Sequence, residues 1–392
     1  MSKTVVVLGA GVGGLTAAAE LRKTLPSSDR IVLIDRMFTG SLGLSSLWVL
    51  RGWRTPEQVR VKPTAATLPG VSMVTAEVER VDTGARTVHC RLAGPIAYDA
   101  LVIALGAGLD TSAVPGLDAA LKSGAAGQFY TPDGAAELHG RIESIESGRI
   151  MVLIAAVPFK CPAAPFEAAF LIADQLGEKF RSGAVRVDAF TPDALPMPVA
   201  GPDVGKALVG LMDATGIGFH SGKSTTRIDP TARAVEFTDG TSASYDLLAV
   251  VPPHSSPAAA VLSTGIGPSG WIPVEPSTMA TDMPGVWAIG DTTMLLLPNG
   301  KPLPKAAIFA EAEAGVAAHQ VARHLGYAAP DTRLTGEGAC YVEIGNGLAA
   351  KGSGNFLALP APQVTLYEPS HTYHAEKEQQ EREWLARWNI RS

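Results

Sequence analysis

Residues 5–15, Val-Val-Val-Leu-Gly-Ala-Gly-Val-Gly-Gly-Leu, decide the fold of this chain. The four residues before the first glycine are all apolar, which predicts a buried strand. The glycines have separate tasks: Gly9 permits a tight turn, Gly11 lets a ligand approach the backbone, and Gly14 lets the following helix pack against the strand. This spacing predicts a strand, a turn and a helix whose N-terminus binds the pyrophosphate of a dinucleotide.

The residues that follow complete this unit. We expect a helix over about residues 16–25 and a second apolar strand over residues 31–34, which ends at Asp35. Asp35 stands about 20 residues after the last glycine, where a carboxylate accepts hydrogen bonds from an adenosine ribose. Arg36 is expected to lie along the adenine. Glycines alone are a weak signal, but with both strands and the acid they are specific for a dinucleotide-binding domain.

An internal repeat indicates a second domain of the same type. Residues 74–105 and 224–251 share an outline of short strands, an aspartate-containing turn, and a final apolar strand after Tyr-Asp. We therefore predict an α/β fold with two Rossmann-like dinucleotide-binding domains, one inserted in the other, and a C-terminal α+β region. The predicted boundaries are 1–112 and 258–328 for the first domain, 113–257 for the inserted domain, and 329–392 for the C-terminal region.

The second domain lacks the glycines of the first. After the apolar run 150–157, where a second phosphate loop is expected, the chain reads Lys160-Cys161-Pro162-Ala163-Ala164-Pro165-Phe166-Glu167. Without glycines the backbone cannot approach a pyrophosphate closely, which argues against NADH or NADPH as the electron donor. Pro162 suits the first position of a helix, so Cys161 is expected at a helix N-terminus with a lowered thiol pKa. A buried, inert cysteine is the alternative.

The chain contains only three cysteines, too few for a disulfide framework, and this count suits a reducing cytosolic compartment. Cys90 lies in an alternating strand, residues 87–92, and is interpreted as a packing residue. Cys340 lies in a strand pattern bounded by glycines, residues 338–345. Because Cys340 is far from Cys161 in the sequence, only a folded site can join the two.

Two further strands indicate which dinucleotide is bound. Residues 98–108 form an apolar strand that ends in small residues, among them Gly106, and residues 285–291 form a strand that ends in Gly290 and Asp291. With the N-terminal unit, these strands resemble the flavin-binding elements of the two-dinucleotide-domain flavoproteins. The resemblance implies FAD as the cofactor, with Asp291 accepting a hydrogen bond from a ribityl hydroxyl while backbone N–H groups face the phosphates.

Within that superfamily the chain resembles the sulfide:quinone oxidoreductases and the flavoprotein subunit of flavocytochrome c sulfide dehydrogenase over nearly its whole length. The motifs that carry this resemblance are residues 160–167, 302–305 and 339–343. The resemblance implies that Cys161 and Cys340 form a redox-active disulfide over the flavin. It also implies that Lys305 and the N-terminus of a helix over residues 306–325 stabilise the anionic reduced flavin.

The function implied by the resemblance is FAD-dependent oxidation of sulfide, or of a related small sulfur nucleophile, with electrons passed from the flavin to a quinone. Alternatives are a flavoprotein subunit that passes electrons to a cytochrome, a thiol-disulfide or persulfide reductase, and a degenerate relative that only binds flavin. Many sulfide:quinone oxidoreductases carry a third functional cysteine, which residues 91–160 lack, so a short sulfur product is expected. The flavocytochrome subunit tethers its flavin through a cysteine where this chain offers Ser41, Ser45 and Ser46, so the FAD is expected to be non-covalent.

An apolar channel for the quinone is expected to include Phe356, Leu357 and the aromatic residues of a C-terminal helix over residues 376–388. Trp384 and Trp388 share one face of that helix. This face suits docking onto the body of the protein better than contact with a membrane or a partner subunit.

Composition limits the remaining possibilities. The net charge is −6 and no block of lysine and arginine occurs, which argues against a nucleic-acid partner. No apolar run is long enough to span a bilayer, so we expect a cytoplasmic protein whose membrane contact is at most peripheral, on the inner face. A homo-oligomer is compatible with the sequence, and no cluster of residues has metal-ligand spacing. His220, His371 and His374 are candidates for proton transfer, although lone histidines are more often ordinary surface residues.

Overall fold

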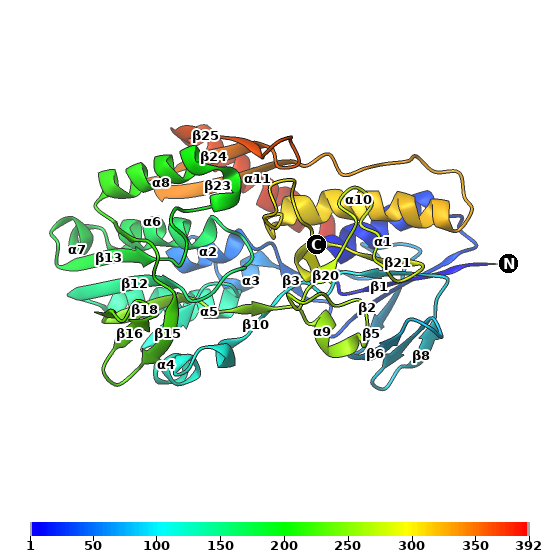
Figure 1. Ribbon diagram of the computed structural model, residues 1–392, viewed down its shortest axis with the longest axis horizontal. Coiled ribbons are helices and arrows are strands. Elements are labelled where there is room, and N and C mark those ends of the chain that lie inside the picture. Colours follow the sequence, from blue (N-terminus) through cyan, green and yellow to red (C-terminus); the bar gives the residue numbers. More distant parts are fainter. Residues whose placement is uncertain (1, 390–392) are drawn as a thin grey trace.

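The computed structural model describes residues 2–389, and Figure 1 shows two α/β bodies side by side. The first body is built on a parallel sheet in the order β21-β9-β1-β2-β5. Its strands are β1 (Thr4–Leu8), β2 (Arg30–Asp35), β5 (Ser72–Thr75), β9 (Ala100–Ile103) and β21 (Val286–Ala288). Helices α1 (Val12–Thr24) and α10 (Ala307–His324) pack against each other over this sheet. The predicted N-terminal unit is therefore present.

Two of the N-terminal glycines are required by packing. Gly9 has a φ of +94°, and a Cβ there would lie 2.5 Å from the carbonyl oxygen of Ala104. A Cβ on Gly14 would lie 1.8 Å from the carbonyl oxygen of Gly9. The tight turn lets α1 begin at Val12, four residues before the predicted start, because the helix follows the glycine turn directly.

The second body has its own parallel sheet, in the order β11-β18-β12-β13-β14. Its strands are β11 (Ala126–Gln128), β12 (Gly148–Ile154), β13 (Val185–Phe190), β14 (Gly218–His220) and β18 (Leu247–Val251). Helices α2 (Ser45–Arg51), α5 (Pro132–Ser144) and α6 (Ala164–Leu176) share a second hydrophobic core with this sheet. The predicted α/β fold class is confirmed, and the exact domain boundaries stay a prediction.

The internal repeat appears as two similar three-stranded antiparallel sheets. The first contains β6 (Val78–Asp82), β7 (Thr87–Cys90) and β8 (Gly94–Ala97), and the second contains β15 (Thr225–Asp229), β16 (Ala234–Phe237) and β17 (Ser242–Ser244). Each leads directly into an interior strand of a parallel sheet, β9 or β18. A short pair between β10 (Gly108–Leu109) and β19 (His254–Ser255) joins the two chain crossings between the bodies.

The remaining elements, of which only helix α8 is long, occupy the connections between these layers. They are β3 (Gly40–Ser41), α3 (Pro56–Val59), β4 (Arg60–Val61), η1 (Thr111–Ala113), α4 (Leu117–Ser123), α7 (Glu178–Arg181), η2 (Pro198–Ala200), α8 (Pro202–Thr215), α9 (Ala258–Val261), β20 (Ile272–Pro273), η3 (Gly290–Thr292) and β22 (Thr293–Met294).

The C-terminal region joins the two bodies. An antiparallel sheet of β23 (Glu337–Gly345), β24 (Leu348–Asn355) and β25 (Gln363–Ser370) packs on α6, and α11 (His371–Trp388) leads from it toward the first body. Trp384 and Trp388 are 5% and 1% exposed and lie in the core of the first body. The predicted docking of this helix face onto the protein is confirmed.

Replacement of Trp388, a buried side chain that holds α11 against the first body, should destabilise the protein. We expect Trp388→Ala to lower the free energy of unfolding by about 3–5 kcal/mol, because a large buried side chain is replaced by a cavity. Leu359→Ala is the matched control, since Leu359 is 76% exposed and its loss should cost less than about 0.5 kcal/mol. Urea unfolding of both variants measures the difference. Equal stability of the two variants would contradict the docking of α11.

Candidate functional site

A cavity of about 650 Å³ lies where the two bodies, the C-terminal sheet and α11 meet. The structure brings most of the predicted site residues to its wall. Those that line it are Gly11, Gly106, Cys161, Gly290, Asp291, Lys305 and Cys340. Gly9, Gly14 and Asp35 are not part of the lining. The first two pack the turn, as described above.

Gly11 and Gly106 leave open space at the cavity. A Cβ added to Gly11 or Gly106 would meet no atom within 4 Å, in contrast to Gly9 and Gly14. Val12 and Gly13, the first residues of α1, also line the cavity, so the free N–H groups of that helix face it. An open glycine cradle at a helix N-terminus fits the pyrophosphate of a dinucleotide.

Asp35 has backbone partners in this structure. One carboxylate oxygen accepts the N–H of Ala10 at 2.8 Å, and the other accepts the N–H groups of Met37 and Phe38 at 2.9 Å. These bonds hold the turn after β1 against the end of β2. The predicted contact with an adenosine ribose stays a prediction.

Lys305 holds the loop that carries Asp291. Its ammonium group donates to the carbonyl oxygens of Asp291 at 2.8 Å and Thr293 at 2.7 Å, and lies 3.7 Å from the centre of the Trp271 ring. Burial lowers the pKa of Lys305 to about 8, although Asp291 and Glu313 oppose the shift. That Lys305 stabilises reduced flavin stays a prediction. The structure does show its two hydrogen bonds to the loop that carries Asp291, and these are called the Lys305 clamp below.

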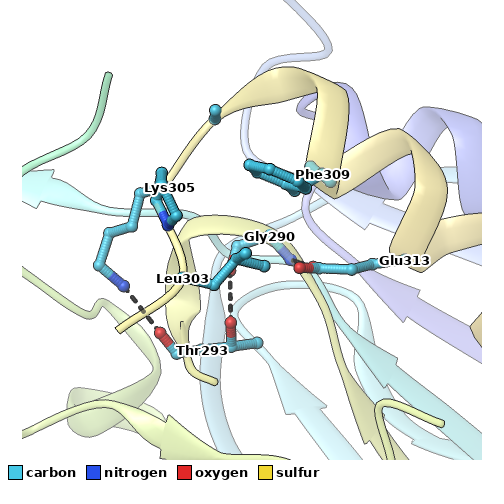
Figure 2. A pocket seen from close by; sticks show the side chains of 9 residues that line it. Gly290, Thr293, Leu303, Lys305, Phe309 and Glu313 are labelled. Carbon is cyan, nitrogen blue, oxygen red and sulfur yellow. Dashed lines mark hydrogen bonds between the residues drawn. The ribbon is translucent and has the colours of Figure 1, made fainter. Parts of the chain in front are cut away.

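Glu313 completes this clamp from the opposite side and was not foreseen from the sequence. Figure 2 shows Lys305 reaching Thr293 from one side and Glu313 reaching Gly290 from the other. The Glu313 carboxylate accepts the N–H of Gly290 at 2.5 Å. Burial raises the pKa of Glu313 to about 7, opposed by the Gly290 hydrogen bond. A glutamate among the small residues of α10 was the only signal that the sequence offered.

The loop before α6, residues 155–163, differs from the prediction. Cys161 has a φ of +55°, and its carbonyl oxygen accepts the N–H of Ala164 at 2.9 Å. The helix therefore begins at Ala164, with Pro165 in its first turn, and the expected start at Pro162 is wrong. The N–H of Cys161 donates to the carbonyl oxygen of Lys305 at 2.7 Å, which fixes the loop to the segment before α10.

The two predicted redox cysteines are neighbours. Cys340 lies in β23, and its thiol and that of Cys161 are free and line the same cavity. The neighbouring Cys161 thiol and Lys377 lower the pKa of Cys340 to about 7, although burial opposes the shift. The neighbouring Cys340 thiol and burial raise the pKa of Cys161, so the expected lowered pKa at Cys161 is wrong and Cys340 is the thiol that ionises more readily. Cys90 is buried in another core, and burial raises its pKa.

A buried charged cluster lies beside the thiols. The ammonium group of Lys377 in α11 pairs with Glu167 in α6 and lies 3.8 Å from Glu343 in β23. Glu343 also accepts hydrogen bonds from Trp48 at 3.2 Å and from His374 at 2.9 Å. Burial raises the pKa of Glu167 to about 8, with Lys377 opposing. Burial works against the charged form of Lys377, but Glu167 and Glu343 outweigh it and raise its pKa.

Sequence reasoning assigned no role to Glu167, Lys377 and Glu343. A signal did exist, because Lys377 precedes Trp384 by seven residues and thus shares its helix face. Of the proposed proton-transfer histidines, His374 joins this cluster. His220 pairs with Asp188 at 3.2 Å and His371 contacts the carbonyl oxygen of Gly347, both away from the thiols.

The class of protein follows from a comparison with known families. The chain belongs to the family described as pyridine nucleotide-disulphide oxidoreductase, whose model matches residues 3–146 and 171–324. It is therefore an oxidoreductase, and the family and the matched structures imply a flavin cofactor. The segment between the two matched parts, residues 147–170, contains β12, the glycine-free loop and Cys161, and the C-terminal residues 325–392 with Cys340 also lie outside the match.

More specific similarity is to sulfide:quinone oxidoreductases. The mitochondrial sulfide:quinone oxidoreductase of Mus musculus is 23% identical over 333 residues, covering 80% of this chain and 69% of the relative. A sulfide-quinone reductase of Aquifex aeolicus is 29% identical over 188 residues, covering 46% of this chain but only 40% of the relative. The resemblance inferred from the motifs is confirmed.

The solved structures agree on the fold. The sulfide:quinone oxidoreductase from Aquifex aeolicus matches with a TM-score of 0.83 at 22% identity, covering 98% of this chain and 91% of that one. An NAD-dependent persulfide reductase from A. fulgidus matches with a TM-score of 0.65 at 17% identity, covering 90% of this chain and 64% of that one. At these identities the likeness shows the fold alone.

The lowered pKa of Cys340 can be measured directly. In the reduced protein we expect its alkylation by iodoacetamide to rise with pH with a midpoint of about 7, because the thiolate is the reactive form. Cys161→Ala removes the neighbouring thiol that lowers this pKa, so the midpoint should move toward that of an ordinary thiol, about 8.5. Site-resolved mass spectrometry follows the reaction, with buried Cys90 as the unreactive control. An unchanged midpoint in the variant would contradict the assignment.

Because Lys305 holds the loop of Asp291, its replacement should lower the affinity for FAD. Lys305→Met removes two hydrogen bonds from a charged donor, each worth about 1.5–3 kcal/mol, and releases the loop of Asp291. We expect FAD affinity to fall by roughly tenfold or more, measured by fluorescence titration. Lys301→Met is the control, because Lys301 is exposed and donates only to Pro198. Equal FAD affinity in both variants would remove this role from Lys305.

Proposed function

We propose that the cavity binds FAD non-covalently and that the protein oxidises sulfide, or a related small sulfur nucleophile, through a disulfide between Cys161 and Cys340. The observation that carries this proposal is that both thiols line the same cavity as the glycine cradle and shift each other's pKa. Two cysteines so far apart in the sequence meet only where the cofactor is expected.

Several residues fit a flavin dinucleotide. Gly11 and the start of α1 would hold the pyrophosphate, Gly106 would allow close approach, and Asp291 would accept a ribityl hydroxyl. Ser41 lines the cavity and Cys90 lies in a separate core, so no further thiol is available for a covalent tether. When bound, FAD accepts two electrons from the reduced sulfur centre and passes them on.

The residues around the thiols suit disulfide chemistry. Hydrosulfide attacks one sulfur of the disulfide, the S–S bond breaks, and a persulfide forms on one cysteine while the other leaves as a thiolate. A leaving thiolate on Cys340 is stabilised by the nearby Lys377. Burial raises the pKa of Glu167 to about 8, so this carboxyl group can exchange a proton with a thiolate near neutral pH. A second nucleophile then removes the sulfane sulfur.

A nicotinamide donor is disfavoured by the second loop. Residues 155–163 contain no glycine, and the N–H of Cys161 is already bonded to Lys305. A dinucleotide pyrophosphate needs both close backbone approach and free N–H groups. An NAD-dependent persulfide reductase has the same fold, so a reductase function is an alternative. That function would require a nicotinamide donor, whereas our proposal does not.

We propose a quinone as the electron acceptor, because the relatives named above act on quinones. A cytochrome partner is the alternative. The expected channel needs a correction: Phe356 is buried against Phe309, and neither Phe356 nor Leu357 lines the cavity, whereas Trp384 does. Within residues 2–389 no helix is long and apolar enough to cross a membrane. Peripheral contact with the inner face of a membrane stays a proposal.

Serine variants test the sulfur chemistry. We expect Cys161→Ser and Cys340→Ser to keep FAD bound but to slow flavin reduction by sulfide at least about 100-fold, because the covalent path is lost. Cys90→Ser should retain the wild-type rate. Anaerobic titration with sulfide, and separately with NADH, follows the flavin absorbance. Near-normal reduction by sulfide in either variant, or reduction of the wild type by NADH alone, would overturn the proposal.

A further inference from the structure

The carboxyl edge of the second sheet carries three polar residues that the function above does not use. In parallel α/β sheets, ligands bind outside this edge. Strands β11, β18 and β12 are neighbours, and the segments after them contain Tyr130, His254 and Lys160 in turn. In a domain with a glycine loop this edge would hold a dinucleotide.

Each of these residues has a polar group without a protein partner. The hydroxyl of Tyr130 and the Nε2 atom of His254 are buried, and neither forms a hydrogen bond within the described chain. The ammonium group of Lys160 likewise has no hydrogen bond or ion pair among residues 2–389. A buried polar group without a hydrogen-bond partner needs an explanation, and a bound water, ion or substrate is one.

The three side chains form one cluster at the cavity. The ammonium group of Lys160 lies 5.8 Å from the centre of the Tyr130 ring, and the rings of Tyr130 and His254 meet edge to face at 4.9 Å. Lys160 and Tyr130 line the cavity beside Cys161, and His254 packs behind Tyr130. The cluster is therefore next to one of the two thiols.

The protonation states make the cluster a donor site. Burial raises the pKa of Tyr130, so its hydroxyl remains a donor. Burial and the nearby Lys160 lower the pKa of His254 to about 4, so it adds no charge at neutral pH. Burial also lowers the pKa of Lys160, but Asp291 and Cys161 oppose this shift. The carboxylate of Asp291 is thus the charged group that faces Lys160, because the raised pKa of Cys161 keeps that thiol protonated.

We propose that Lys160 and Tyr130 form a binding site for a small monoanion, hydrosulfide, at the position where a related domain would bind a dinucleotide. One ammonium and one hydroxyl donor suit a compact anion, and the glycine-free loop excludes a larger phosphate ligand. The site holds the nucleophile beside Cys161 before it attacks the disulfide. This inference rests on the proposed oxidation of sulfide and names the groups that select its substrate.

Stopped-flow reduction of the FAD-loaded protein by sulfide tests this site. We expect Tyr130→Phe to raise the half-saturating sulfide concentration roughly 2–10-fold, and Lys160→Met roughly 10-fold or more, because the second variant loses a charged donor. The limiting rate should stay within about twofold, since neither group takes part in bond exchange. Tyr367→Phe and Lys206→Met are the controls, because both side chains are exposed.

The outcomes separate this site from other roles. A lower limiting rate with unchanged half-saturation would place the residues in the chemistry and overturn a binding role. Weaker FAD binding in Lys160→Met, measured by fluorescence titration, would make Lys160 a flavin contact and overturn it as well.

If sulfide fails to reduce the wild-type flavin, the proposed function is wrong but the anion site is still testable. An iodide titration then tests the anion site. Saturable quenching of flavin fluorescence by iodide that is lost in Lys160→Met would support the anion site. Equal quenching in the two proteins would overturn it.

Discussion

The hydrogen bond from the Cys161 amide to the Lys305 carbonyl is the contact on which the site depends. It fixes the loop of the second sheet to the segment that begins α10 of the first body. The side chain of the same Lys305 holds the carbonyl groups of Asp291 and Thr293. One residue therefore sets the position of a thiol and of the loop expected to hold the cofactor. Any movement between the bodies would disturb both at once.

The buried cluster around Lys377 is better explained by thiol chemistry than by stability. Removing ions from water costs several kcal/mol each, and a buried ion pair often stabilises no more than apolar side chains of the same shape. Here the ammonium group lies beside a thiol whose pKa falls to about 7. Trp384 and Trp388 supply the apolar contact that keeps α11 docked, so the charge is held in place by the same helix.

The sequence was sufficient to predict those elements that are marked by a local pattern of residues. The glycine turn, the repeated sheets, the start of α10 and the buried tryptophans of α11 follow from spacing and periodicity. The start of α6 was missed because Cys161 adopts a left-handed conformation that no local pattern announces. The thiol pKa values were assigned to the wrong cysteine, because the decisive neighbours, Cys340 and Lys377, are distant in the sequence. Such contacts exist only after folding.

The second domain keeps the sheet edge of a dinucleotide-binding domain but lines it with different residues. Its topology still delivers three loops to the carboxyl edge of β11, β18 and β12, because strand order and direction are set by the core. The ligand, by contrast, depends on a few residues in those loops. Where the first domain has open glycines and free N–H groups, the second has a bonded amide, a thiol and two side-chain donors. The proposed hydrosulfide site would thus use side-chain donors where a dinucleotide-binding domain uses backbone N–H groups, on the same sheet topology.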